Sequence, residues 1–470
     1  MSFLYRVRNS PRRLVTLGVL GGSFLAAMEA TIVATAMPTV VDQFGGLAHY
    51  SWVFSAYMLT STVTTPVWGR IADVHGRRRP YLVAITAFLV GSMLCGVATS
   101  MTQLIAFRAL QGVGAGGMLP LGMVIMGDMF SLEERARAQA LFAGVWGISS
   151  IAGPLVGAVL TESASWRWIF FINLPFGMVA AWLVSRFLVD RQVDDRGDVD
   201  YVGAAVLMSA VTALMLALNG TGVRDASISS SVVRLLYGAA AALGALFVVM
   251  ERRAAHPTLP VSLLANRMVA TTTASGTLLG VAIFGALAFV PLYVQAALGR
   301  TAREAGGVLT PLLLGWVAMS IVTGRLLPRV GFRPFILAGL TCVSLGFLGL
   351  ASVGPASPLW ALHVYLGLMG IGMGMTMLSL LLAVQASVSR DQLGVATSLG
   401  QFSRSIGGAV GVAVMGAVVA GSIPASGPTP AALALGLHRA FALGAAVSIA
   451  ALASALLVPG GLPEQKKTAG

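Results

Sequence analysis

Long apolar segments separated by short polar ones make up most of this chain of 470 residues. A helix needs about 20 mostly apolar residues to cross a bilayer. The fourteen segments that meet this requirement are Leu14–Met37, Ser51–Val67, Tyr81–Thr99, Thr102–Met126, Ala138–Leu160, Trp168–Val189, Tyr201–Leu218, Val232–Met250, Val269–Ala297, Gly306–Leu327, Phe335–Val353, Leu359–Val384, Leu393–Ala420 and Ala440–Val458. The pattern predicts an all-α integral membrane protein with 14 spans, the first of them retained rather than cleaved as a signal peptide.

The composition excludes a water-soluble protein. Of all residues, 57% are hydrophobic and 10% are charged, whereas soluble domains contain about 25% charged residues. A soluble chain of this size has too small an interior to cover so much apolar surface. The formal net charge of +13 does not indicate nucleic-acid binding, because the basic residues lie in short connections between apolar segments. Membrane lipid is therefore the expected partner, and nucleic acid is not.

The basic residues are distributed unevenly over the two sides of the predicted membrane. With the N-terminus in the cytoplasm, 22 of the 30 Lys and Arg residues fall on the cytoplasmic side, six fall outside, and two, Arg108 and Arg404, lie within spans. Short cytoplasmic loops of membrane proteins are enriched in Lys and Arg. The distribution predicts that both termini are cytoplasmic. The excess of Arg over Lys favours a bacterial source, and hence a bacterial plasma membrane.

A ten-residue pattern of glycines and arginines occurs twice in the chain. Gly69–Arg78 reads GRIADVHGRR, and Gly324–Arg333 reads GRLLPRVGFR, at an offset of 255 residues. Both stretches follow an apolar segment on the predicted cytoplasmic side. Repeated halves of this kind are typical of secondary transporters. The repeat predicts a six-helix half in residues 1–190, an inserted helix pair in residues 191–267 and a second six-helix half in residues 268–470.

Four other stretches place charges, glycines and prolines inside or beside apolar segments. They are Met28–Pro38 (MEATIVATAMP), Arg108–Gly116 (RALQGVGAG), Gly153–Gly157 (GPLVG) and Trp166–Pro175 (WRWIFFINLP). Together with the Gly69–Arg78 loop, these stretches resemble signatures of the major facilitator superfamily, and specifically of its 14-span drug:H⁺ antiporter branch. The resemblance covers nearly the whole chain. It implies a major facilitator fold of two six-helix halves plus two inserted helices.

The resemblance implies a gating role for Gly69, Arg70, Asp73, Gly76, Arg77, Gly153 and Pro154. Glycine lets a helix end turn tightly and approach its neighbour. Asp73 is able to accept hydrogen bonds at a helix N-terminus of the other half, and Pro154 is expected to kink its helix. Two alternatives stay open: the arginines of the loop also fit a purely topological role, and the fifth-span glycines also fit ordinary close packing.

Glu29 is the only carboxylate well inside a predicted span, and it stands where the antiporter branch usually has Asp. The branch also commonly has Asn where Ala34 stands. Glu29 lies about 12 Å below the outer end of its span and Arg108 about 9 Å below the same face, at ~1.5 Å per residue. Ionisable residues in spans are costly and mark functional sites. The matching depths allow a Glu29–Arg108 ion pair.

This pair leads to a hypothesis of proton coupling. A proton from outside would neutralise Glu29 and release Arg108. Burial raises the pKa of a carboxylate and a nearby cation lowers it, and such opposing effects favour titration in a useful range. The alternative is a static ion pair that orders two helices.

The resemblance also implies a central substrate cavity between the two halves. Its expected polar and aromatic members are Thr31, Gln111, Trp146, Tyr293, Gln295 and Arg404. Arg404 lies roughly mid-membrane with no acid nearby in its own span. Two interpretations of it stay open, contact with an anionic group of the substrate and bonding to backbone carbonyls alone.

The sequence as a whole predicts a monomeric, proton-coupled antiporter that exports small hydrophobic or amphiphilic molecules, as in multidrug efflux. The proton is the coupling ion, and neither a metal nor another cofactor is expected. The alternative on the same fold is an exporter of a lipid, glycolipid or siderophore. A membrane enzyme and an ATP-driven pump are excluded because the chain has no clustered His or Cys residues, carboxylate dyad or phosphate-binding glycine loop. Only the Gly153-Pro154 context speaks against uptake by symport.

Overall fold

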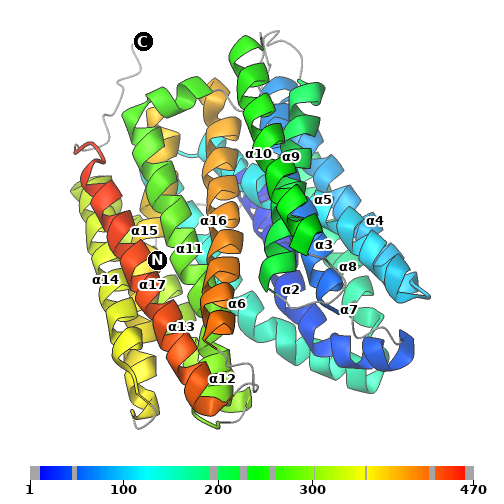
Figure 1. The fold of residues 1–470 in the computed structure, drawn as a ribbon. Coiled ribbons are helices and arrows are strands. Elements are labelled where there is room, and N and C mark those ends of the chain that lie inside the picture. The colour runs from blue at the N-terminus through cyan, green and yellow to red at the C-terminus, as the bar shows by residue number, and fades with distance from the viewer. Residues whose placement is uncertain are drawn as a thin grey trace.

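The computed structural model describes residues 11–44, 50–189, 200–222, 230–254, 261–300, 302–354, 357–422 and 429–460. Within these ranges the chain forms helices and turns, and no β-strand is present. Figure 1 shows the helices in two bundles, with the first helices, blue to cyan, beside the last ones, yellow to red. The predicted all-α class is therefore confirmed for the described part of the chain.

The helices fall into three consecutive groups. The N-terminal bundle contains α2 (Pro11–Phe44), α3 (Tyr50–His75), α4 (Arg78–Val97), α5 (Met101–Met129), α6 (Leu132–Ser163), α7 (Trp168–Phe171) and α8 (Asn173–Phe187). The inserted helices are α9 (Tyr201–Gly222) and α10 (Ser230–Arg253). The C-terminal bundle contains η2 (Val261–Ala265), α11 (Arg267–Leu292), η3 (Tyr293–Ala297), α12 (Ala302–Val308), α13 (Thr310–Val330), α14 (Phe332–Ser352), α15 (Leu359–Ser387), η4 (Arg390–Gln392), α16 (Leu393–Gly421) and α17 (Pro430–Leu456).

Several helices begin at polar residues that cap free backbone amides. The side chain of Ser100 accepts a hydrogen bond from the amide of Gln103 and starts α5. Ser131 and Glu134 form a capping box at the start of α6, and Asn266 caps α11. Such caps satisfy amides that have no partner within the helix. Polar residues in the short connections thus mark where α5, α6 and α11 begin.

Length and hydropathy identify many of these helices as membrane spans. Among the described residues, 11 helices are long and apolar enough to cross a bilayer. The long helices α2, α3 and α6, with 34, 26 and 32 residues, are not among them. In α3, seven Ser and Thr residues between Ser51 and Thr65 lower the hydropathy. The chain is therefore a multi-pass helical membrane protein. The structure supports 11 spans among the described residues, against the 14 predicted from the sequence.

The 255-residue repeat is visible in the backbone and in side-chain contacts. Gly76 and Gly331, which are 255 positions apart, follow α3 and α13 with φ angles of +84° and +88°. In this left-handed region glycine has no Cβ to clash. Two residues further on, Arg78 donates to the carbonyl of Ser185 near the end of α8, and Arg333 donates to the carbonyl of Leu456 at the end of α17. The same turn and the same arginine contact thus occur in both bundles.

The two bundles meet along two pairs of helices, α3 with α16 and α6 with α13. The inserted helix α9 packs against both α3 and α16, whereas α10 packs mainly on α9. A buried apolar cluster that includes Val63, Leu207 and Phe402 joins α3, α9 and α16. The inserted helices therefore lie at the edge of the seam between the bundles, where Figure 1 shows them in green.

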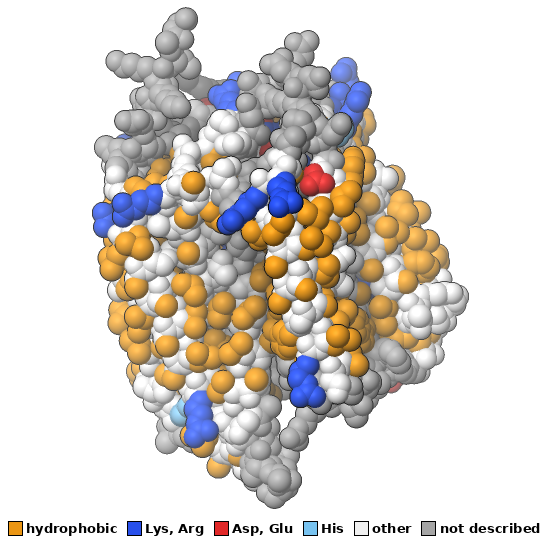
Figure 2. All heavy atoms as spheres, turned by 45° about the horizontal axis from the view of Figure 1, so that its top comes forward, with side chains coloured by type: hydrophobic (Ala, Val, Ile, Leu, Met, Phe, Trp, Pro, Cys, Tyr) orange, Lys and Arg blue, Asp and Glu red, His pale blue; other side chains and the backbone are white. Residues whose placement is uncertain are grey.

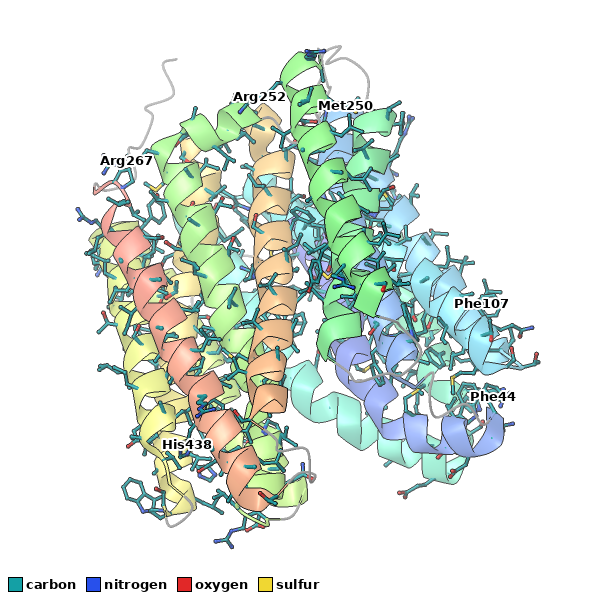
Figure 3. The ribbon with its side chains drawn as sticks, viewed as in Figure 1. Phe44, Phe107, Met250, Arg252, Arg267 and His438 are labelled. Atoms are coloured by element: carbon teal, nitrogen blue, oxygen red, sulfur yellow. The ribbon has the colours of Figure 1, made fainter. Side chains whose placement is uncertain are left out.

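The surface has an apolar belt with charges at its edges. Figure 2 shows hydrophobic side chains around the visible face, with Lys and Arg above and below them. Arg252 and Arg267 lie at one end of the bundles, which we call the inner end and which the sequence predicts to face the cytoplasm (Figure 3). Phe44 and His438 lie at the opposite end, called the outer end (Figure 3). An apolar belt of this kind is what a bilayer-embedded protein requires.

Candidate functional site

Glu29 and Arg108 form an ion pair inside the N-terminal bundle. Nη1 of Arg108 lies 2.5 Å from Oε1 of Glu29, and the two side chains are 1% and 0% exposed. Glu29 lies on α2 and Arg108 lies on α5, seven residues after the helix begins. The contact expected from the depths of these residues in their spans is present.

Arg108 has further partners that fix its orientation. Its Nη1 donates to Oε1 of Gln111 at 2.7 Å, and its Nε donates to the carbonyl of Val53 at 3.1 Å. The guanidinium carbon lies 4.2 Å from the centre of the Tyr57 ring, a distance typical of cation–π contact. These contacts hold Arg108 beside α3 as well as α2. The cation therefore keeps several partners even where its contact with Glu29 is broken.

Asn173 completes the surroundings of Glu29, and sequence reasoning missed it. Its Nδ2 donates to Oε2 of Glu29 at 2.8 Å and to Oγ of Ser92 at 2.9 Å. Ser92 in turn donates to the carbonyl of Phe170 at 2.9 Å. The signal for Asn173 was its place in the WRWIFFINLP stretch, directly after the break between α7 and α8. We call Glu29, Tyr57, Ser92, Arg108, Gln111 and Asn173 the outer cluster.

Small residues let the helices of the outer cluster approach one another. A Cβ at Gly91 of α4 would lie 2.6 Å from Cα of Gln111 on α5. Real Cβ atoms essentially never approach that closely. Glycine is therefore required where α4 crosses α5, and the crossing brings Ser92 and Gln111 into the same buried region.

Asp73 joins the two bundles at the inner end. Its Oδ1 accepts a hydrogen bond from the amide of Gly394 at 3.1 Å, and its Oδ2 accepts one from the amide of Val395 at 2.8 Å. Both amides belong to the first turn of α16, where backbone N–H groups lack helical partners and favour an anion. The cross-half contact expected of Asp73 at a helix N-terminus is present.

Arg77 links Asp73 to two other parts of the inner end. Its Nη1 lies 2.6 Å from Oδ1 of Asp73, and its Nε lies 2.8 Å from Oδ2 of Asp128 at the end of α5. Its Nη2 donates to the carbonyl of Arg390 at 3.2 Å. Burial alone lowers the pKa of Arg77, but the two carboxylates outweigh burial and raise that pKa. Arg77 therefore stays charged, and we call Asp73, Arg77, Asp128, Gly394 and Val395 the inner cluster.

The inner cluster depends on close backbone contact between α3 and α16. A Cβ at Gly69 would lie 2.8 Å from the carbonyl oxygen of Gly394, and a Cβ at Gly394 would lie 2.7 Å from the carbonyl oxygen of Gly69. Either Cβ would push the helices apart. Gly69, predicted as a gating residue, is thus located where the bundles touch.

The other predicted gating residues lie near this contact or along α6. Gly76 ends α3, and Nε of the half-buried Arg70 has no hydrogen-bond partner among the described residues. Gly153 is buried in α6, which continues from Leu132 to Ser163 without interruption. The side chain of Pro154 lies outside the described residues.

The predicted cavity residues are not brought together into one site. Gln111 is buried in the outer cluster, Tyr293 is buried with its hydroxyl 3.0 Å from the carbonyl of Val353, and Gln295 is exposed. Trp146 is half-buried with its ring centre 6.3 Å from that of Trp316, across the α6–α13 contact. The half-buried Arg404 bonds Gln401. The side chain of Thr31 lies outside the described residues.

Two repeated helical bundles, joined along α3–α16 and α6–α13 and holding a buried ion pair, define a membrane transporter built from two repeated halves. A family model described as Major Facilitator Superfamily matches residues 19–412. The chain therefore belongs to this superfamily. It is a transporter and not an enzyme.

Known proteins are similar to this chain over most of its length. "Multidrug transporter protein MdtP" of Bacillus subtilis is 37% identical over 413 residues, which cover 88% of this chain and 76% of that protein. "Multidrug resistance protein 3" of the same organism is 34% identical over 411 residues, covering 87% and 80%. The crystal structure of the human organic anion transporter MFSD10 (TETRAN) has a TM-score of 0.67 at 15% identity, covering 95% and 100%. At that identity the last likeness shows the fold alone.

Proposed function

We propose that the protein is a proton-coupled antiporter that exports small hydrophobic or amphiphilic molecules by alternating access. Relatives named for multidrug transport and resistance, at 37% and 34% identity, support the cargo class. The observation that carries the coupling is the fully buried Glu29–Arg108 pair. An ionisable pair in this position is costly to maintain and marks a site of function in membrane proteins.

In the proposed cycle, a proton from the outer side is transferred to Glu29 and removes its negative charge. Arg108 then loses its anionic partner but stays bonded to Gln111 and the Val53 carbonyl. The link between α2 and α5 weakens. Since α2 packs on α6, and α6 packs on α13 of the other bundle, the change reaches the seam between the bundles. Substrate leaves outward in the state that receives the proton.

The inner cluster is proposed to close the inner end while the transporter is open outward. Asp73 bonds the first amides of α16, and Arg77 fixes Asp73 from the other side. Opening the inner end requires these bonds to break. Gly69, Arg70 and Gly76 shape the helix end that carries the cluster, and Gly153 and Pro154 are proposed to allow α6 to bend in the same step.

Several further features belong to the same proposal. Counting α2, α3 and α6 as spans gives 14 transmembrane helices, in halves of residues 1–190 and 268–470 around an inserted pair. The protein resides as a monomer in a bacterial plasma membrane with both termini cytoplasmic. Thr31, Gln111, Trp146, Tyr293, Gln295 and Arg404 serve the substrate path, and the proton is the coupling ion without another cofactor.

Reconstitution into liposomes with an internal pH dye tests the proposal. Under an imposed proton gradient, drugs and lipids are added one at a time to native protein, Glu29→Gln and the control Glu304→Gln, whose side chain is 38% exposed. Antiport predicts compound-triggered proton movement in native protein and in the control but not in Glu29→Gln. Transport without proton movement, or movement indifferent to Glu29→Gln, contradicts the coupling. A response to lipids alone identifies a lipid exporter instead.

A further inference from the structure

Arg404 places a cation in the middle of a membrane-spanning helix. It lies eleven residues after Leu393, where α16 begins, or about 16 Å along the axis at ~1.5 Å per residue. The apolar core of a bilayer is about 30 Å thick. Arg404 therefore lies near mid-depth, far from the headgroups that its side chain would need to reach for hydration.

The face of α16 that carries Arg404 points into the protein. Thr397, Gln401 and Arg404 follow one another at intervals of four and three residues, so they share one stripe of the helix. Thr397 accepts a hydrogen bond from Gln385 of α15 at 3.2 Å. On α11, a Cβ at Gly280 would lie 3.2 Å from Cγ of Arg404. The missing side chain at Gly280 thus leaves room for the stem of the arginine.

Arg404 has donors to spare. Among the described residues it forms no ion pair, and its hydrogen bond goes to Oε1 of Gln401 one turn earlier on the same helix. The side chain is half-buried. None of its nitrogens is both fully buried and without a hydrogen-bond partner. The remaining N–H groups are therefore only partly covered by the protein and are able to meet a further partner. No bond to a backbone carbonyl is formed within the described part of the chain.

The charges inside the spans do not balance. Glu29 and Arg108 neutralise each other at 2.5 Å, which leaves the guanidinium of Arg404 without a counter-charge among the described residues. A lone charge at mid-membrane is costly. A carboxylate, phosphate or sulfonate matches the planar donor fork of arginine with two parallel hydrogen bonds. An anionic occupant would thus remove the imbalance.

We propose that Arg404 and Gln401 form an anion-binding subsite, and that the exported compound is an amphiphile with a carboxylate, phosphate or sulfonate group. The subsite rests on the export function proposed above. Gln401 holds the guanidinium in place through its amide oxygen, and its amide nitrogen is free to donate to the same anion. The apolar part of the compound contacts the surrounding spans.

Binding measurements on the full-length protein in detergent test the subsite with matched probes. The soluble pair is 1-naphthaleneacetate and its neutral amide, and the lipid pair is lysophosphatidic acid and the uncharged monoacylglycerol with the same acyl chain. In Arg404→Gln, anion binding is expected to be at least about tenfold weaker, because a charge-assisted contact is lost. Binding of the neutral amide changes less than about twofold, and Arg404→Lys, which keeps the charge but cannot form the two parallel bonds, recovers only part of the anion affinity. The control is Arg439→Gln at the outer end, where Arg439 bonds Ser422 at 3.3 Å.

Each outcome decides between the alternatives. If Arg404→Gln weakens the binding of both acids but not of their uncharged counterparts, the result supports a general anion subsite. If it weakens the binding of lysophosphatidic acid alone, the result supports a subsite for an anionic lipid. No binding of either acid to native protein, or equal loss for acid and amide, overturns it. Arg404-dependent binding without proton movement in liposomes refutes antiport but not the subsite. Proton movement triggered by neutral or cationic compounds and unchanged in Arg404→Gln refutes the subsite but not antiport.

Discussion

The outer and inner clusters lie at opposite ends of α5 and connect different parts of the molecule. Arg108 and Asp128 are 20 residues apart on this helix, or about 30 Å at ~1.5 Å per residue. The outer cluster draws its side chains from α2, α3, α4, α5 and α8, all in the N-terminal bundle. The inner cluster joins α3 and α5 to α16 of the C-terminal bundle. A relative movement of the bundles must therefore break the inner cluster, but it leaves the outer one intact.

The two clusters also differ in hydration. Glu29 and Arg108 are 0% and 1% exposed. In the inner cluster Asp73 is also buried, at 2%, but its partner Arg77 and the neighbouring Asp128 are 13% and 24% exposed. Losing a partner in a dry site costs far more than losing one where water replaces it. The outer cluster thus suits a change of protonation within a fixed frame. The inner cluster suits a contact that opens and closes in each cycle.

The largest effect is expected when the cation of the outer cluster is removed, which tests directly whether burial makes this cluster costly to disturb. In Arg108→Leu the carboxylate of Glu29 stays buried without its counter-charge, which is expected to lower the free energy of unfolding by about 3–5 kcal/mol. Thermal unfolding in detergent, followed by tryptophan fluorescence, measures the loss. The double variant Glu29→Gln/Arg108→Leu is expected to recover most of it. A single variant as stable as native protein would show that Glu29 becomes neutral by taking up a proton, or is hydrated, once Arg108 is gone.

Removing the charge of the inner cluster should change conformation more than stability. Asp73→Asn loses charge-assisted bonds to the amides of α16, worth about 1.5–3 kcal/mol. The inner end is therefore expected to open at least about tenfold more often. Spin labels at the exposed positions His75 and Gln392 measure this opening as a longer distance population between the bundles. Glu304→Gln, at a carboxylate outside both clusters, is the control, and a distance distribution unchanged in Asp73→Asn would refute the closing role of the cluster.

The sequence predicted the depth of these residues better than their direction. Hydropathy and charge located Glu29 and Arg108 at matching depths, and the repeated motif identified both inner turns. Depth follows from counting residues along a helix, but direction around the axis depends on the packing of distant segments. Gln111 thus turns toward Arg108, Tyr293 is buried against the end of α14, and Gln295 is exposed. Asn173 was missed because an uncharged amide carries no cost that would single it out in a sequence.

A substitution that adds a methyl group without changing a charge tests how far the inner cluster depends on close backbone contact. In Gly394→Ala the new Cβ would lie 2.7 Å from the carbonyl oxygen of Gly69 and 2.5 Å from Oδ1 of Asp73. Overpacking costs about 1–3 kcal/mol, and the better helix propensity of alanine offsets about 1 kcal/mol of this. The closed inner end is therefore expected to lose up to about 2 kcal/mol of stability, which the same spin-label distances measure. Gly400→Ala on the same helix is the control, because nothing lies within 4 Å of its Cβ. Equal distances in both variants would show that α3 and α16 do not touch in the membrane.

The smallest effect is expected at a charged pair outside both clusters. Arg300 and Glu304 lie 3.7 Å apart with side chains 52% and 38% exposed, and exposed pairs contribute about 0–1 kcal/mol. Glu304→Gln should therefore unfold within about 1 kcal/mol of native protein, and the His75–Gln392 distance should stay the same. Thermal unfolding at low and high salt measures the difference, since salt screens exposed charges but hardly affects dry ones. If Glu304→Gln were as damaging as Arg108→Leu, burial would not explain the special cost of the outer cluster, and the contrast between the two ends of α5 would need another cause.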